Sequence, residues 1–196
     1  MNDLRKQTDE TLLRLYIDGN NSAFDVLLKR YESKVFTYLL YSVRSQELAE
    51  DLFQDVFVKI ITTLRKNMYI ECGKFSSWVM RIAHNLVIDY FRQNKNGGVV
   101  SNEDIPFDLF DNSLNLEDSV EKQLIDRQVL NEVKELVYML PYAQREVVLM
   151  RFNQDLSFKE IAETTGVSVN TALGRMRYAI MNLRKIAQCN NISLVG

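Results

Sequence analysis

Glycine and proline are too scarce in this chain for a fold built on strands and tight turns. Only 7 of the 196 residues are glycine and 2 are proline, and strand connections usually need these residues to reach their backbone conformations. Helices joined by short connections need far fewer of them. The hydrophobic fraction of 46% and the charged fraction of 26% are those of an ordinary folded protein. We therefore predict an all-α fold.

Apolar residues recur at helical spacing through the first half of the chain. The spacing predicts helices over about residues 8–17, from the Asn20–Ser22 cap to residue 41, over 46–66 and over 75–93. In the fourth of these, the expected buried stripe is Trp78, Val79, Ile82, Leu86 and Tyr90. Four helices of this length can pack as one bundle, so we assign residues 1–94 to a four-helix domain.

A break in the helical pattern divides the chain. Residues 95–118 contain a glycine pair, Pro106 and an acidic run, and no Lys or Arg lies between Lys95 and Lys122. We interpret this segment as an acidic interdomain linker. Residues 119–196 then form a second, smaller helical domain, with helices expected over about 119–138, 141–152, 157–165 and 168–187.

The most specific signal is a short helix, a tight turn and a basic helix between Leu156 and Lys185. Ser157 and Glu160 have the spacing of a capping box. Gly166 suits a left-handed turn residue, and Ser168 can cap the next helix. This pattern is typical of a helix-turn-helix, whose second helix lies in the major groove of DNA.

The second helix of this motif is expected to face outward with polar and basic residues. No acidic residue follows Glu163, and arginine can pair with guanine through two hydrogen bonds. The alternative is a helical hairpin whose basic face is merely solvated. The outward positions are Asn170, Thr171, Gly174, Arg175, Arg177 and Tyr178.

Composition argues against several other classes of protein. Cys72 and Cys189 lie far apart without a CxxC or Cys/His cluster, so neither a metal site nor a disulfide is predicted. With one histidine, no paired carboxylates in an apolar setting and no phosphate-binding glycine loop, we predict no catalytic residues, no cofactor and no enzyme activity. No apolar stretch approaches the ~20 residues of a membrane span and the start is polar, so a cytoplasmic protein is expected.

Two parts of the chain resemble one family. Residues 140–185 resemble the C-terminal promoter-binding domain of extracytoplasmic-function (ECF) type sigma factors, in the sigma-70 superfamily. The segment Ala49–Phe57 resembles the part of these proteins that binds the clamp coiled coil of RNA polymerase, and Phe75–Arg92 resembles the helix that captures the melted −10 element. The C-terminal resemblance is carried by Leu140-Pro141, Gln144–Glu146, Leu156-Ser157, Glu160–Ala162, Gly166–Ser168, Thr171 and Arg175.

The resemblance implies a sigma factor that binds the clamp coiled coil and flap of core RNA polymerase, melts and captures the −10 element, and reads the −35 element. It also implies an anti-sigma factor as a further partner. It assigns polymerase binding to Asp51, Gln54, Asp55 and Val58. It assigns −10 DNA binding to Tyr69, Lys74, Ser77, Arg81, Asn85 and Arg92. It assigns −35 DNA binding to Arg145, Ser168, Asn170, Thr171, Gly174, Arg175, Arg177 and Tyr178.

Some positions depart from the family pattern. Asp55 stands where glutamate is common, and Gly174 and Tyr178 replace polar or basic residues of the recognition helix. The net charge of −2 also argues against a free-standing DNA-binding protein. The alternatives are a helix-turn-helix regulator that binds symmetric half-sites without polymerase, and a helical adaptor without DNA activity. Promoter binding that requires polymerase would separate the sigma factor from both.

Overall fold

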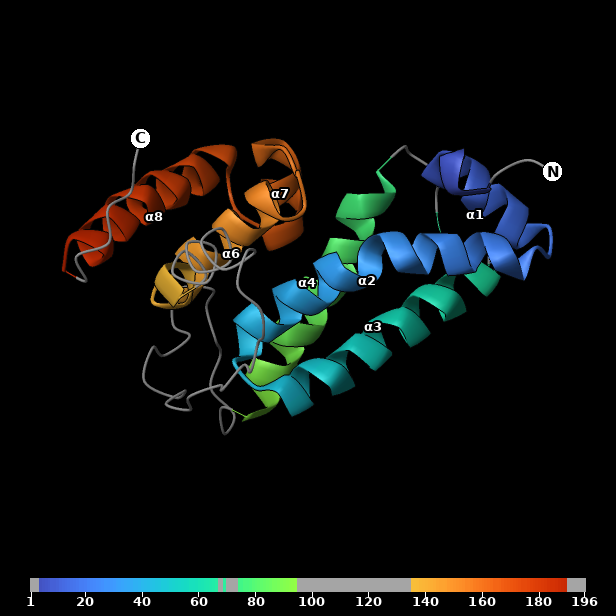
Figure 1. The fold of residues 1–196 in the computed structure, drawn as a ribbon, viewed down its shortest axis with the longest axis horizontal. Helices are drawn as coiled ribbons and strands as arrows, with labels where there is room; N and C mark the ends of the chain where they lie inside the picture. Colours follow the sequence, from blue (N-terminus) through green and yellow to red (C-terminus); the bar gives the residue numbers. More distant parts are fainter. Residues whose placement is uncertain (1–3, 67–68, 70–73, 95–134, 190–196) are drawn as a thin grey trace, which may run out of the picture.

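The structure, a computed structural model, describes residues 4–66, 69, 74–94 and 135–189. All secondary structure in these residues is helical, which confirms the all-α prediction. The predicted linker lies outside the described residues, as does all of the predicted helix 119–138 except its last turn. The elements are a short 3-10 helix η1 (Leu4–Lys6), α1 (Asp9–Ile17), α2 (Asn21–Val43), α3 (Gln46–Arg65), α4 (Phe75–Asn94), α6 (Tyr142–Phe152), α7 (Phe158–Thr165) and α8 (Val169–Cys189) (Figure 1).

Helices α1 to α4 pack on one another as the predicted bundle. The helix α2 contacts α1, α3 and α4, and α3 contacts α4. The hydroxyl of Thr8 caps α1 by accepting a hydrogen bond from the Thr11 amide at 3.3 Å. The left-handed backbone of Arg44 (φ 55°) ends α2, and Ser45 caps α3 directly afterwards. The reversal between α2 and α3 therefore takes only two residues.

The helix-turn-helix has the predicted local geometry. The Ser157 hydroxyl accepts from the Glu160 amide at 3.3 Å, and the Glu160 carboxylate accepts from the Ser157 amide at 2.9 Å, so the capping box is formed. Gly166 adopts the left-handed conformation with φ 69°, and the Ser168 hydroxyl accepts from the Thr171 amide at 3.0 Å. Helix α8 packs on α6 and α7.

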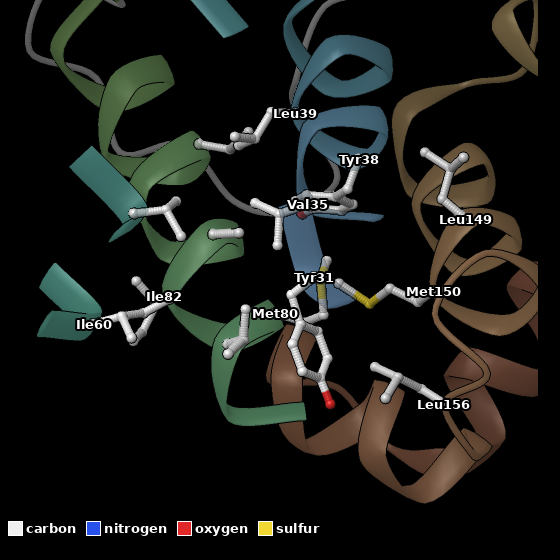
Figure 2. Close-up of a cluster of buried hydrophobic side chains, with 14 of the residues drawn as sticks. Tyr31, Val35, Tyr38, Leu39, Ile60, Met80, Ile82, Leu149, Met150 and Leu156 are labelled. Carbon is white, nitrogen blue, oxygen red and sulfur yellow. The ribbon is translucent and has the colours of Figure 1, made fainter. Parts of the chain in front are cut away.

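The two halves of the described chain share one hydrophobic core. Helix α6 packs on α2, and α7 packs on α4; Figure 1 shows α6 to α8 beside these two helices, with α3 on the far side. In Figure 2, Met150 and Leu156 from the second half extend toward Tyr31 and Met80 from the first. All four side chains belong to a single buried cluster.

This packing corrects the expectation for α4, which buries two faces rather than one stripe. Trp78, Leu86 and Tyr90 are only half-buried, as partners of the core cluster. His84 was expected outside the buried stripe and is 4% exposed. The second half of the chain covers this additional face, a tertiary contact that helical periodicity within α4 cannot show. The residues buried on that face include Ser77, Met80, His84 and Phe91.

The capping box of α7 gives a test of the local fold. Replacing Ser157 with alanine removes the acceptor for the Glu160 amide, so we expect a loss of about 1 kcal/mol in the free energy of unfolding. Urea unfolding monitored by circular dichroism measures it. The matched control is Thr62→Ala, because the exposed Thr62 hydroxyl bonds only to the Val58 carbonyl of its own helix. Equal stability of the two variants would contradict the capping role.

Candidate polymerase and promoter interfaces

The four predicted polymerase-binding residues form an exposed stripe on α3. Asp51, Gln54, Asp55 and Val58 are all exposed, and Val58 is 61% exposed although it is apolar. The opposite side of the helix is buried against α2 and α4 through Leu52, Val56 and Ile60. We call these four residues the α3 stripe. Helix α3 itself lies on the far side of the bundle from α6 to α8 (Figure 1).

Three of the residues predicted to bind −10 DNA share a second exposed surface. Arg81, Asn85 and Arg92 are exposed and are separated by four and seven residues, which places them on one side of α4. Lys74 precedes the helix at the same register and is half-buried, with its ammonium 3.5 Å from the Glu163 carboxylate of α7. We call these four residues the α4 stripe. Its two arginines and one amide can meet phosphates and a base edge.

Aromatic side chains cluster beside the α4 stripe. The Tyr69 ring centroid lies 4.7 Å from that of Trp78 and 5.9 Å from that of Phe75. Tyr69 is half-buried in this arrangement. It is therefore a packed aromatic that remains partly accessible, as a platform for an unstacked base requires.

The recognition helix α8 presents most of its predicted residues to solvent. Ser168, Asn170, Thr171, Arg177 and Tyr178 are exposed, and Tyr178 is 59% exposed. Gly174 lies among them, and a Cβ built on it would meet no atom within 4 Å. The backbone at Gly174 is therefore open to close approach by a ligand.

Three predicted DNA-binding residues lie elsewhere. Ser77 is 3% exposed and donates to the Lys74 carbonyl at 3.0 Å, because it shares the buried face of α4. Arg175 is half-buried against the body of the second half, and one of its terminal nitrogens has no hydrogen-bond partner among the described residues. Arg145 is 4% exposed. Ser77 and Arg145 are therefore not part of the exposed surface, and Arg175 is only partly accessible.

Arg145 serves the turn that precedes α6. Its guanidinium donates to the Tyr138 and Leu140 carbonyls at 3.0 and 3.1 Å, and it lies 5.9 Å from the ring centroids of Tyr138 and Tyr142. Burial, reinforced by the neighbouring Arg44, lowers the pKa of Arg145. Such a buried guanidinium is a structural donor that satisfies two carbonyls.

A buried polar cluster between the two halves was not predicted as a site. The Glu146 Oε1 atom accepts from the Tyr38 hydroxyl at 2.7 Å and from the Tyr142 hydroxyl at 2.9 Å, and it lies 2.7 Å from Nδ1 of His84. The side chains of His84 and Glu146 are 6% and 3% exposed. We call these four residues the Glu146 cluster. No spacing within α4 signals this cluster, because the partners of His84 come from α2 and α6.

The charge state of the cluster follows from its contacts. Burial raises the pKa of Glu146, but the interactions with His84, Tyr38 and Tyr142 outweigh it and hold that pKa below its usual value. The carboxylate is therefore ionised and accepts only, so Nδ1 of His84 carries the proton that it donates. Burial, followed by the charge of Glu146, raises the pKa of Tyr38, whose hydroxyl stays a donor.

Family models match both halves of the chain. The model described as Sigma-70 region 2 matches residues 27–97, which include the α3 and α4 stripes. The model described as Sigma-70, region 4 matches residues 130–176, which include α6, α7 and the start of α8. The chain belongs to the sigma-70 family.

Curated relatives of this chain are sigma factors, and a solved structure of one such protein shares its fold. RNA polymerase sigma factor SigZ of Bacillus subtilis is 26% identical over 162 residues, which cover 83% of this chain and 85% of SigZ. ECF RNA polymerase sigma factor SigW of the same organism is 26% identical over 174 residues, 85% of this chain and 90% of SigW. The solved structure of sigma factor RpoE in complex with the anti-sigma factor NepR, from Bartonella quintana, has a TM-score of 0.61 at 18% identity and covers 84% of this chain and 96% of RpoE.

These findings identify the protein as a sigma factor of the ECF type. Its function is to bind core RNA polymerase and direct promoter-specific initiation of transcription, with a helix-turn-helix that reads promoter DNA. This assignment decides against the helix-turn-helix regulator that acts without polymerase. Among the helices that the structure describes, none is long and apolar enough to cross a membrane.

The buried Arg145 and the exposed Arg177 can be tested for separate structural and binding roles. Arg145→Ala leaves the Tyr138 and Leu140 carbonyls without their donor, and we expect it to lower the free energy of unfolding by about 2 kcal/mol. Arg177→Ala, on the exposed side of α8, should change that free energy by less than about 0.5 kcal/mol. Chemical denaturation of both variants measures the difference. A stable Arg145→Ala protein would remove its structural role.

Proposed function

We propose that the α3 stripe, the α4 stripe and the outer side of α8 are respectively the polymerase, −10 and −35 contacts of this sigma factor. The observation that carries the proposal is the exposure of all three polar surfaces on helices whose opposite sides are buried. Rigid helices hold these side chains at fixed spacing, which suits docking to a preformed partner. The corresponding division of the chain is residues 1–94, the linker 95–118 and residues 119–196.

The α3 stripe suits docking to a helical surface of the polymerase. Asp51, Gln54 and Asp55 offer carboxylate and amide groups, and the exposed Val58 adds an apolar contact at the same face. Interfaces combine an apolar centre with a polar rim in this way. We assign the clamp coiled coil to this stripe and the flap to the second domain.

The two DNA surfaces suit different forms of the promoter. On the α4 stripe, Arg81 and Arg92 would bind phosphates while Asn85 meets an unpaired base edge, and Tyr69 offers its accessible side to an unstacked base. On α8, Asn170, Thr171 and Arg177 would lie in the major groove of the −35 duplex, and Gly174 lets the backbone approach it. We assign structural roles to Ser77 and Arg145. To Arg175 we assign a phosphate or base contact that is secondary to that of Arg177.

The protein acts by binding and has no reaction of its own to catalyse. RNA polymerase carries out the chemistry, so the sigma factor works where the polymerase is, in the cytoplasm. The solved relative RpoE is bound to an anti-sigma factor, and we propose a partner of the same kind here. Run-off transcription with core polymerase and a library of promoter templates tests the whole assignment. Transcription independent of the added chain would refute it.

The α3 stripe can be tested without DNA. We expect Asp51→Lys with Gln54→Ala to reduce the affinity for core polymerase at least tenfold, because the double change reverses one charge and removes an amide at the proposed contact. Co-purification and titration with labelled polymerase measure the affinity. Glu10→Lys on α1 is a matched charge reversal away from the stripe. Unchanged co-purification of the double variant, with the fold intact by circular dichroism, would count against the assignment.

The outer side of α8 can be tested with specific and unrelated DNA. In the holoenzyme, Arg177→Ala should weaken binding to a −35 promoter by about 1–3 kcal/mol if the side chain reads a base. The loss for Arg175→Ala should be smaller, because that side chain is half-buried. Equilibrium binding over a salt series measures both. If Arg177→Ala weakens binding to all sequences equally, Arg177 is a phosphate contact only.

A further inference from the structure

The Glu146 cluster joins the two promoter-reading halves of the sigma factor through groups whose separation costs free energy. Tyr38 and His84 come from α2 and α4, while Tyr142 and Glu146 come from α6. Moving the halves apart takes the Tyr38 and His84 donors away from the Glu146 carboxylate. A buried carboxylate that loses its partners must become hydrated or protonated. The cluster therefore links closure of the two halves to the pairing of one charge.

Hydrogen bonds from side chains of one half to main-chain carbonyls of the other fix the position in which the halves meet. The Lys34 carbonyl on α2 accepts from the side-chain amide of Gln154 at 2.6 Å and from that of Asn153 at 3.4 Å. At the other end of the interface, the Arg44 guanidinium donates to the Tyr138 carbonyl and lies 5.0 Å from the centre of its ring. Both ends of the contact thus carry hydrogen bonds that fix how the halves dock.

The surface ion pairs across the same interface are weaker candidates for holding it. The Lys34–Asp155 pair, at 3.2 Å, has side chains 37% and 82% exposed, and the Lys74–Glu163 pair, at 3.5 Å, has side chains 40% and 39% exposed. Exposed pairs contribute little because water competes for both charges. The buried Glu146 carboxylate has no such competition, so the closed arrangement depends mainly on it and on the shared apolar core.

The docked arrangement cannot read both promoter elements at once. The names −10 and −35 place the elements about 25 base pairs apart, which is roughly 85 Å of duplex at ~3.4 Å per base pair. A compact chain of this length has a radius of gyration of only about 16 Å. Residues 95–134 can span at most ~130–145 Å when extended, so the chain is long enough to reach both elements only after the halves separate.

We propose that Glu146 is the latch of a closed, promoter-inactive state of this sigma factor, in which α6 and α7 are docked on α2 and α4 through the Glu146 cluster. Core polymerase opens the latch by binding the two halves at separate places. Because both halves belong to one chain, their local concentration is on the order of millimolar, so even a modest interface keeps the free protein closed. The inference goes beyond the assignment of contacts above and is tested first without polymerase.

The closed state can be followed by the rate of chemical crosslinking. Lys34→Cys and Asp155→Cys, in a background with Cys72→Ser and Cys189→Ser, place two accessible thiols across the interface. A short bis-maleimide with a disulfide in its spacer joins them when the halves are docked. In the free protein we expect the two cysteines to be crosslinked rapidly. The crosslinking rate should fall at least tenfold in Glu146→Gln, which removes the charge paired with His84. Tyr38→Phe, on the other half, should slow it in the same direction.

Matched controls separate the latch from the fold and from the surface charges. Glu163→Gln breaks the exposed pair with Lys74 and should change the joining rate by less than about twofold, because exposed pairs contribute little. Circular dichroism and thermal unfolding report whether each variant is folded. Joining rates unchanged in both Glu146→Gln and Tyr38→Phe would overturn the proposal.

The complementary test crosslinks the halves in the docked position and leaves the four residues of the Glu146 cluster unsubstituted. The protein joined between Lys34→Cys and Asp155→Cys should lose at least tenfold in run-off transcription with core polymerase, and reduction of the spacer should restore it. Joining Gln144→Cys to Asn182→Cys links α6 to α8 within the second half, where the native pair is 2.8 Å apart, and should leave transcription unchanged. A locked protein that transcribes as well as its reduced form would overturn the latch. If the locked and the reduced protein are both inactive, the contact assignments are refuted instead.

Discussion

The ionised carboxylate of Glu146 sets the arrangement of this molecule. An apolar interface between two helical domains could slide or rotate at little cost, because dispersion and hydrophobic burial have no strong direction. A buried charge allows no such freedom, since its partners must stand at hydrogen-bond distance. Tyr38 and His84 supply these partners from one half and Tyr142 from the other, so α6 has one register on α2 and α4. The apolar contacts of Met150 and Leu156 then follow that register (Figure 2).

The local structure could be predicted from the sequence because its causes are local. Helical spacing located the seven α-helices described, and the caps at Ser157 and Ser168 and the left-handed Gly166 were predicted from residues within four positions of them. The burial of Ser77 and His84 could not be predicted in this way. One face of α4 packs on its own bundle and another on the second half of the chain, and the second contact depends on residues more than sixty positions away.

The same distinction applies to the binding residues. The α3 stripe is exposed because it lies opposite a single buried face, and the predicted outward positions of α8 are exposed as well, apart from the half-buried Gly174 and Arg175. Arg145 was grouped with the DNA-binding residues on family pattern alone, and its carbonyl partners at the preceding turn became visible only in three dimensions. A charged residue in a conspicuous motif can thus serve the fold beneath the binding surface.

The division of the Glu146 cluster between two halves has a consequence for exchanging parts among relatives. Sigma factors look modular, and a designer would cut such a chain in the linker and join it to the second domain of another protein. Here that operation would separate a carboxylate from the phenol and imidazole that donate hydrogen bonds to it. A hybrid that keeps Tyr38 and His84 but receives an apolar residue at position 146 would bury two unsatisfied donors. Compatible halves must therefore be chosen as pairs, with positions 38, 84, 142 and 146 treated as one inherited unit.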